Sequence, residues 1–232
     1  MTELRVAHRA TAQIKLPARL TSQGHLRSFA KNNRISFYSV LSMLRAIACW
    51  MLLSVVPATA HQPVVNSESS TVNTPFEVNE PEVSKAIFAQ LKGAAQYYRI
   101  ASDVPFRFYA GITVPKIDGC PLDHRFSLDV LDKDLRLIVA ADGERFDWWP
   151  WYESFGGKWY WVGPEIGSHF KGNRQLEAGT YYLRVFNAEQ AGRYVLAIGD
   201  IESFPIDVIA RTLIQMPGIN HDFWDTATCK GK

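Results

Sequence analysis

Residues 179–198 read GTYYLRVFNAEQAGRYVLAI, and this stretch decides the fold class. Two short runs within it, 180–186 and 193–198, are rich in β-branched and aromatic residues, and a turn-rich connection joins them. Apolar and polar side chains alternate in part of each run, as they do in a strand with one face in a core and the other in solvent. The stretch therefore predicts two strands that close the domain.

Similar short runs lie upstream, separated by Asp-, Gly- and Pro-containing turns, at 97–100, 106–114, 126–131 and 135–140. The segment 83–91 fits a short helix or a strand equally well, because periodicity does not decide so short an apolar run. Short strands with frequent turns and no helices between them predict an all-β fold, an antiparallel β-sandwich of jelly-roll type over 83–200.

A short C-terminal helix is predicted within 201–232. Ser203 is a candidate N-cap, apolar residues follow at roughly helical spacing from Ile206 to Met216, and Pro217-Gly218 is expected to end the helix. We expect its apolar side to pack on the sandwich. Docking on a membrane surface or a partner is the alternative, which the single basic residue of the helix, Arg211, does little to support.

Three segments resemble one known family. Residues 176–185 (LEAGTYYLRV) and 192–198 (GRYVLAI) are similar to the closing hairpin of bacterial pre-peptidase C-terminal domains, in which a Leu-x-x-Gly-Thr-Tyr-Tyr strand pairs with a Gly-x-Tyr-x-Leu strand. Residues 96–100 (QYYRI) resemble the early Asp-x-Tyr strand of that family. The resemblance extends over 84–200 and implies a non-catalytic accessory or binding domain, and it assigns no site residues.

The N-terminal region 1–60 reads as a basic extension followed by a secretory signal peptide. An apolar run at 46–56, too short to span a bilayer, follows Arg45, and Ala58-Thr59-Ala60 supplies small residues for cleavage. We therefore expect an exported protein, periplasmic or extracellular. Translation from Met43 would leave 1–42 as an upstream artefact, and a genuine basic arm is the alternative.

Charge divides unevenly along the chain. Eight of the 25 Lys and Arg residues but only Glu3 of the 23 acidic residues lie in 1–60, so the remainder carries 17 basic and 22 acidic side chains. This acidic remainder argues against nucleic acid and anionic membranes as partners. Its first part, 61–82, is polar and rich in turn residues and is predicted to be a disordered linker.

Two cysteines remain after processing, Cys120 and Cys229. In an oxidising compartment they can form one intramolecular disulfide, which would tie the C-terminus to a loop in the middle of the domain. Two separate thiols are the alternative.

The strongest local anomaly is the aromatic segment 146–161, FDWWPWYESFGGKWYW, in which nine of sixteen residues are aromatic. Pro150 and Gly156-Gly157 predict that it is partly a loop. The rings either plug one end of the sandwich, stack on sugars, or form a protein-binding surface. The candidate ligand-binding residues are Trp148, Trp149, Trp151, Tyr152, Trp159 and Trp161.

Acidic turns form a second candidate site. Asp129, Asp132 and Asp134 lie close enough in sequence to supply oxygen ligands to Ca²⁺ outside the cell, although their spacing is not that of an EF-hand. Ordinary solvated turns are the alternative explanation.

Catalytic motifs give no support for an enzyme, because the sequence has neither a Gly-x-Ser-x-Gly elbow nor a His-Glu-x-x-His motif. We expect a non-catalytic module that binds a protein partner or has a structural role in the cell envelope. A carbohydrate-binding module that uses the aromatic segment, and a secreted hydrolase with an unrecognised site, are the alternatives.

Overall fold

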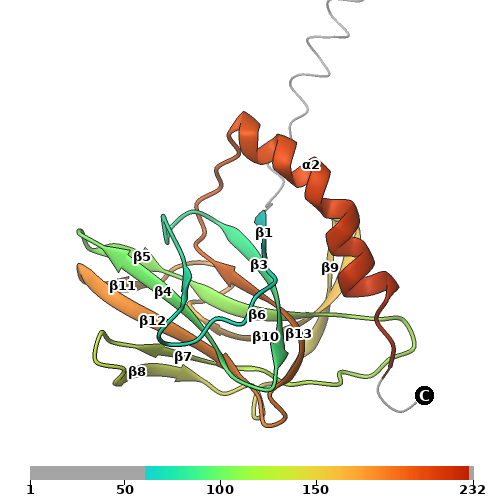
Figure 1. Ribbon diagram of the computed structural model, residues 1–232, viewed down its shortest axis with the longest axis horizontal. Coiled ribbons are helices and arrows are strands. Elements are labelled where there is room, and N and C mark those ends of the chain that lie inside the picture. Colours follow the sequence, from blue (N-terminus) through green and yellow to red (C-terminus); the bar gives the residue numbers. More distant parts are fainter. Residues whose placement is uncertain (1–60, 230–232) are drawn as a thin grey trace, which may run out of the picture. The chain divides into compact units, whose positions relative to one another are not determined.

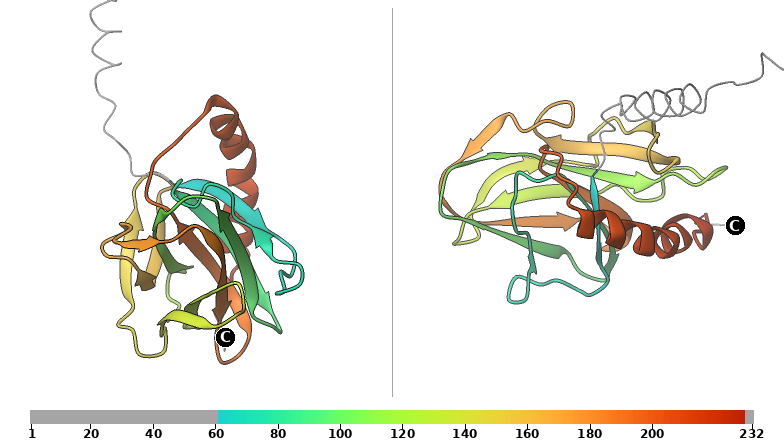
Figure 2. Two further views of the ribbon diagram at one scale, coloured as in Figure 1. Left: turned by 90° about the vertical axis from the view of Figure 1, so that its left-hand side faces the viewer. Right: turned by 90° about the horizontal axis from the view of Figure 1, so that it is seen from above.

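The computed structural model describes residues 61–229, whose strands form two facing sheets with one helix outside them (Figures 1 and 2). The predicted all-β sandwich with a C-terminal helix is confirmed. The predicted signal peptide and the alternative start at Met43 lie outside the described residues. The elements are β1 (Gln62–Asn66), β2 (Phe76–Glu77), β3 (Lys85–Lys92), β4 (Gln96–Ser102), β5 (Phe106–Phe108), β6 (Ala110–Pro115), β7 (Ser127–Leu131), β8 (Leu137–Ala141), β9 (Trp149–Glu153), β10 (Lys158–Ile166), β11 (Arg174–Leu176), β12 (Gly179–Phe186), β13 (Ala191–Ile198) and α2 (Ile206–Asn220), followed by the π-helical turn η1 (His221–Asp225).

One sheet has six strands in the order β1-β3-β13-β6-β10-β9, and the other has five in the order β2-β4-β12-β7-β8. A small β5–β11 pair completes the fold. Neighbouring strands are antiparallel except β1 with β3 and β2 with β4, which are parallel. The core lies between the two sheets, where every second side chain of the central strands is fully buried.

A small polar network lies inside this core. The Tyr98 and Tyr194 hydroxyls are 2.7 Å apart, and the side-chain oxygen of Gln96 accepts hydrogen bonds from Asn66 and Tyr194. Burial raises the pKa of Tyr98 to about 12, so this hydroxyl stays protonated at neutral pH. Because its members bond to one another, the network adds specificity to the core without leaving polar groups unpaired.

The predicted closing hairpin is wrong. Strand β12 pairs with β4 and β7 in the five-stranded sheet, whereas β13 pairs with β3 and β6 in the six-stranded sheet. The connection between them therefore crosses from one sheet to the other. At the end of β12 the buried residues Leu183 and Val185 alternate with half-buried ones as predicted, whereas the last five residues of β13 are all buried. The core-facing sides of the two strands point at each other, with Leu183 and Val185 on one side and Leu196 on the other.

The predicted linker 61–82 is instead part of the sandwich. Strand β1 pairs in parallel with β3, and Val78 is buried at 3% exposure. The polar residues Asn66 and Ser70, which favoured a linker in the sequence, are buried and hydrogen-bond with each other. The sandwich therefore includes residues 62–82, which were predicted to lie outside it.

The C-terminal helix is longer than predicted. It begins at Ile206 after Pro205, with no side-chain cap from Ser203, and it continues through Pro217 into η1. Proline removes one backbone hydrogen bond from a helix interior. Packing of Ile219 and Phe223 against Phe88 compensates for this loss, because the residues after the proline carry the best-buried part of the helix.

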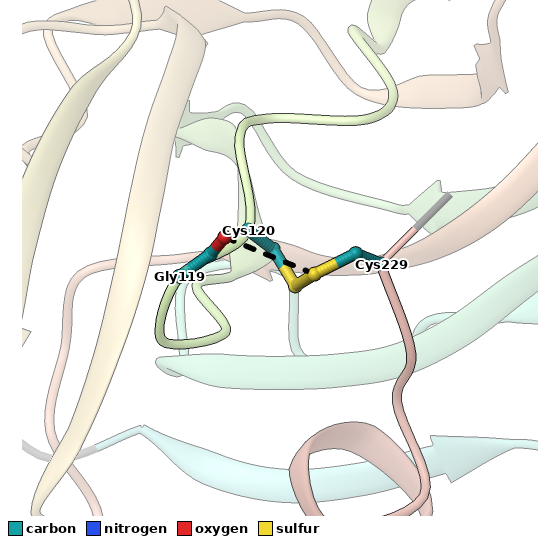
Figure 3. The surroundings of a disulfide bond; sticks show 3 residues. All are labelled: Gly119, Cys120 and Cys229. Carbon is teal, nitrogen blue, oxygen red and sulfur yellow. Dashed lines mark hydrogen bonds between the residues drawn. A yellow bond between two sulfur atoms is a disulfide. The ribbon is translucent and has the colours of Figure 1, made fainter. Parts of the chain in front are cut away.

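A disulfide closes the tail of the domain. Cys120 and Cys229 are bonded, with their Cα atoms 5.3 Å apart, and the bridge joins the loop after β6 to the segment after η1 (Figure 3). It spans 109 residues of sequence, so it fixes the helical C-terminus to the middle of the chain. This is the pairing considered from the sequence.

Candidate functional site

The aromatic segment is partly a loop, as expected, because 146–148 and 154–157 lie outside the strands. Its other residues belong to β9 and β10, which form a hairpin at the edge of the six-stranded sheet. Strand β9 is the edge strand and pairs only with β10 among the described strands. An edge strand tolerates Pro150, because proline lacks the N–H that a central strand would need. The register places opposite residues on one face, which divides the rings into two sets.

The first set faces solvent. Tyr152 lies opposite Trp159 with ring centroids 5.2 Å apart, and the two side chains are 48% and 44% exposed. The Lys116 ammonium lies 5.8 Å from the Trp159 ring and 5.6 Å from the Trp161 ring. We call Tyr152, Trp159 and Trp161 the aromatic platform. It is an exposed aromatic surface with one cation beside it.

Trp148 belongs to neither set. Its ring packs against the main core, and its indole N–H donates to the Gly143 carbonyl at 2.8 Å. Gly163 makes room for it, because a Cβ at that position would meet the indole at 2.2 Å. Trp148 is therefore a structural residue of the sandwich.

The second set, which includes Trp149 and Trp151, lies on the side of the hairpin that faces α2. Trp151 contacts Tyr160 and Phe170, with ring centroids 6.0 Å and 5.4 Å apart. These rings form one wall of a cleft of about 500 Å³ between the outer face of the six-stranded sheet, the hairpin and α2. Trp149 does not line the cleft; it is 42% exposed and its ring lies 6.4 Å from that of Phe170. Of the six predicted ligand-binding residues, three thus form the platform, Trp148 lies in the core and Trp151 lines the cleft.

The floor of the cleft is a row of small residues. Ala86, Ala197 and Gly111 lie in register on β3, β13 and β6, and all three line the cleft. A side chain at Gly111 would meet the Tyr109 hydroxyl at 2.6 Å, so this position has no room for a larger residue. Two alanines and a glycine side by side leave the outer face of the sheet recessed at this point.

The next row along the same strands is large. Phe88 and Val195 lie in register, and they pack with Tyr160, Ile219 and Phe223 into a second hydrophobic cluster. Through this cluster, the C-terminal part of α2 and η1 pack on the outer face of the sheet. Phe88, Val195 and Tyr160 also line the cleft, so the cleft extends from the small-residue row to the edge of this cluster.

Helix α2 forms the roof. Thr212, Leu213, Met216 and Asn220 line the cleft, while Val208 and Ile219 are buried. The helix packs on the sandwich as expected, but several of its large aliphatic side chains remain in solvent. The most exposed are Ile206 at 86%, Ile214 at 79% and Leu213 at 72%. None of the described helices is long and apolar enough to cross a membrane.

A strained turn supports the wall. His169 and Phe170 both have positive φ, 51° and 62°, which non-glycine residues rarely adopt. The Glu165 carboxylate accepts hydrogen bonds from both of their backbone N–H groups, at 2.8 Å and 3.1 Å. The turn holds the Phe170 ring against Trp151. Strained backbone of this kind is concentrated at ligand clamps and active sites.

Two further carboxylates around the cleft, those of Glu153 and Asp200, are also engaged. Glu153 accepts from the Phe155 and Gly156 N–H groups, and Asp200 binds Arg107 and accepts from the Gly172 N–H. Burial, with Glu165 and Asp200 nearby, raises the pKa of Tyr109 far above its usual value. These groups are loop anchors that hold the rim of the cleft.

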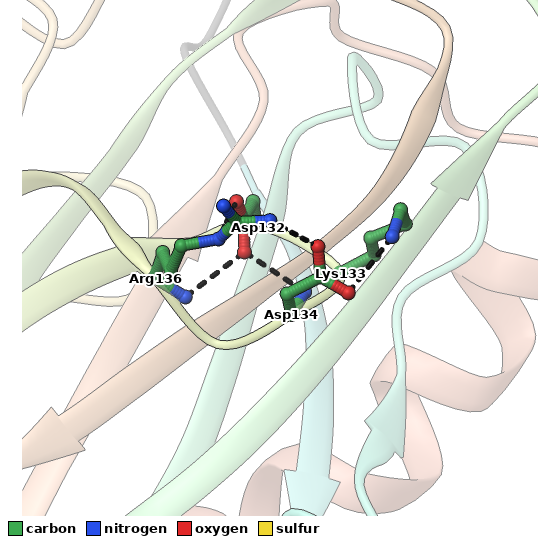
Figure 4. Close-up of polar contacts among 4 residues, drawn as sticks. All are labelled: Asp132, Lys133, Asp134 and Arg136. Atoms are coloured by element: carbon green, nitrogen blue, oxygen red, sulfur yellow. Dashed lines mark hydrogen bonds and ion pairs between the residues drawn. The ribbon is translucent and has the colours of Figure 1, made fainter.

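The acidic turns do not assemble a calcium site. Asp129 is buried and paired with Arg184, while Asp132 and Asp134 bind Arg136 and two backbone N–H groups (Figure 4). Hydrogen bonds from Lys133 and Arg136 lower the pKa of Asp134. Within residues 61–229 no group of three His, Cys, Asp or Glu side chains is arranged to hold a metal ion. Ordinary turns, the alternative explanation, describe these residues better.

The sequence analysis did not identify most of the residues that line the cleft. Ala86, Ala197 and Gly111 are small residues in three separate strands, and only strand pairing reveals that they are neighbours. The one available signal was the aromatic segment, which contains Trp151 and Tyr160. The alternation that predicted strand 193–198 also contained Ala197, but the pattern does not say which residues of other strands lie beside it.

Among solved structures, the chain is similar to the pre-peptidase C-terminal domain of collagenase from Bacillus anthracis. The identity is 10%, the TM-score is 0.27, and the match covers 59% of this chain and 94% of that domain. This is a weak similarity at the level of the fold, and the sandwich assignment rests on the strand pairing. No family model matches the chain, and no curated protein matches it.

Proposed function

We propose that this protein is an exported, non-catalytic binding module that holds a small apolar molecule in the cleft beneath α2. The observation that carries the proposal is the recessed row of Ala86, Ala197 and Gly111 under a helix, which creates a cleft of about 500 Å³. Ligand pockets of proteins have volumes of about 300–1,000 Å³ and are lined mostly by apolar and aromatic side chains.

Two further observations support a binding site over loose packing. The cleft leaves apolar side chains of the sheet, the hairpin and α2 facing an open space, and exposed apolar surface of this kind often marks a ligand-binding groove. The backbone strain at His169 and Phe170 is held in place by Glu165, which shows that the wall is built at an energetic cost. Three carboxylates at the rim, those of Glu153, Glu165 and Asp200, are occupied by backbone amides and Arg107, which supports a structural role for them rather than acid–base chemistry.

The test is binding of N-phenyl-1-naphthylamine, a neutral apolar fluorophore, to the purified protein. We expect saturable fluorescence enhancement that Ala197→Phe weakens at least tenfold, because the added ring fills the floor. Ala140→Phe is the matched control, since Ala140 lies exposed on β8 of the other sheet. Unchanged binding by Ala197→Phe would contradict the proposal.

A glycan is the second candidate ligand, and the aromatic platform is the observation that favours it. Tyr152 and Trp159 present adjacent exposed rings with Lys116 beside them. Sugar C–H groups can stack on such rings. Binding to a glycan array that Trp159→Ala abolishes and Ala197→Phe leaves intact would assign the platform to carbohydrate, and a blank array would remove this candidate.

A further inference from the structure

Strand β8 leaves one edge of the five-stranded sheet open. It is the last strand of that sheet, and among the described strands it pairs only with β7 (Figure 1). An edge strand presents a row of unpaired backbone N–H and C=O groups, with which a strand of another chain can pair. The free side of β8 is therefore able to accept a further strand.

The other edges of the two large sheets are short, covered or interrupted. Strand β2 has only two residues, α2 lies against β1, and β9 contains Pro150. Short strands, covers and proline are means by which proteins keep sheet edges from pairing with other chains. Strand β8 reads Leu-Ile-Val-Ala-Ala over 137–141 and contains no charge, proline or glycine. Its one irregularity is a shift of register with β7 at Ile138, which leaves 139–141 regularly paired, so β8 is the least protected of the four edges.

Large aliphatic side chains lie in solvent along this edge. Leu137 is 60% exposed, Leu135 in the preceding turn is 44% exposed, and Ile138 is 39% exposed. Short uncharged segments of aliphatic residues tend to pair with strands of other chains when they lie at an exposed edge. Contact with a second strand would remove these side chains from water, which favours association.

The charges that flank β8 are complementary to themselves. Arg136 precedes the strand and Asp142 follows it, and each lies three residues from Val139. If two β8 strands pair antiparallel with Val139 at the centre, Arg136 of each copy lies opposite Asp142 of the other. Opposite charges directly across such a pair are stabilising, and like charges are destabilising. The chain turns at 133–134 and bends at 143–146, so the pairing is confined to 136–142.

Both charged side chains are accessible to a second copy. The Arg136 side chain is 74% exposed and bonds Asp132 and Asp134 within its own turn, and the Asp142 side chain is 51% exposed and bonds Arg145. Exposed ion pairs of this kind contribute little to stability. Exchanging them for pairs between two molecules therefore costs little.

We propose that β8 is the contact strand of a symmetric dimer, in which it pairs antiparallel with β8 of a second copy about a two-fold axis at Val139. The two five-stranded sheets then join into one continuous sheet. The same strand of both molecules is used in this contact, so the assembly closes at two copies. The cleft beneath α2 lies on the outer face of the other sheet and does not take part.

The test is sedimentation equilibrium of the purified protein over a range of concentrations. We expect a monomer–dimer equilibrium with a dissociation constant of about 1–100 µM, because a contact through one short strand is small. Ile138→Lys should weaken dimerisation at least tenfold, since a charge next to the two-fold axis opposes edge pairing. Leu137→Lys, at the more exposed position, repeats this test in case Ile138→Lys does not fold.

Charge reversal tests the register of the pair. Arg136→Asp or Asp142→Arg alone places like charges opposite each other and should weaken the dimer about three- to tenfold. The double variant Arg136→Asp/Asp142→Arg restores opposite charges, so dimerisation should return towards that of the wild type. Arg211→Asp is the matched control, because Arg211 is also exposed and bonds an aspartate, Asp207, but lies on α2.

Each other outcome overturns the proposal. A protein that stays monomeric throughout the concentration range has no such dimer. A dimer that persists in both Ile138→Lys and Leu137→Lys is formed by another surface. Failure of the double charge reversal to restore the association lost in the single variants shows that the two-fold register is wrong. Assembly beyond two copies also contradicts the proposal, because the two-fold contact occupies both β8 edges.

Discussion

The two faces of the six-stranded sheet are built from neighbouring residues of the same strands, yet one is sealed and the other is open. On the inner face Ile87, Leu196 and Ile112 lie in register and are at most 1% exposed. On the outer face the adjacent row is Ala86, Ala197 and Gly111, and it forms the floor of the cleft. A shift of one residue along each strand thus separates a packed core from an open cleft.

The covers of the two faces differ as well. A second sheet covers the inner face and contributes fully buried residues such as Leu128 and Leu183. One helix covers the outer face, seated by Ile219 and Phe223 at its C-terminal end, with large aliphatic side chains left in solvent. Alternation along the strands places apolar side chains in the core between the two sheets. A cleft on the outer face requires small residues in the strands and a helix that covers only part of the sheet.

The largest effect should come from the inner row. Leu196→Ala leaves a cavity in a closed core and should reduce the free energy of unfolding by about 2–5 kcal/mol. Ala197→Gly, one residue away on the outer face, should cost about 1 kcal/mol at most. Urea unfolding of both variants measures the difference, and equal losses would break the distinction between the faces.

The disulfide should rank second, because it secures the cover of the outer face. Replacing Cys120 and Cys229 by serine should reduce stability by about 2–4 kcal/mol, since the bridge closes a long loop in the unfolded chain. It should also weaken binding of the apolar probe, because the segment after η1 loses its attachment. Denaturant unfolding and probe titration of the double variant check both effects, and unchanged stability would contradict the first.

The third-largest effect should be a change of the free energy of unfolding with pH, caused by His61 at the rim of the cleft. Burial and the nearby Lys171 ammonium lower the pKa of His61 to about 4, below its ordinary value of about 6.5. Between these values the unfolded chain binds a proton that the folded chain does not, so stability falls as pH decreases from 7 to 4. We expect about 1–2 kcal/mol from His61, because the side chain is half-buried and solvent reduces the full effect.

The measurement for His61 is the difference between the free energies of unfolding at pH 7 and pH 4, in the wild type and in His61→Gln. The substitution removes the titrating group and leaves the other carboxylates and histidines in place. A pH dependence that is the same in both proteins would show that His61 does not contribute.

The smallest effect should come from the solvent side of α2. Leu213 is 72% exposed and Ile214 is 79% exposed, so Ile214→Ser should change stability by about 0.5 kcal/mol or less. Thermal unfolding would show whether this holds. A loss comparable with that of Leu196→Ala would mean that the outer surface of α2 is covered by protein, for example in an oligomer.

The fold class could be predicted from the sequence because it depends on local patterns. The alternation in 180–186 and 193–198 identified two strands, and turn residues separated the others. Which strands pair depends on contacts distant in sequence, so the assumed hairpin between β12 and β13 failed. The linker prediction failed for a related reason, since Asn66 and Ser70 are polar residues whose partner, Gln96, lies in another strand.

The candidate site could be predicted only in part. The aromatic segment marked the hairpin, and its two faces then followed from register rather than from composition. Nothing in a single sequence distinguishes Ala197 as a cleft floor from an alanine on any other strand.

The most direct test of the cleft is a crystal structure of the protein soaked with a brominated alkane, because bromine is located by its anomalous scattering. The account predicts a bromine peak beneath α2, over Ala197 and next to Trp151, in the wild type and none there in Ala197→Phe. A peak only on Tyr152 and Trp159, or no peak despite binding in solution, would contradict the assignment of the cleft as the binding site.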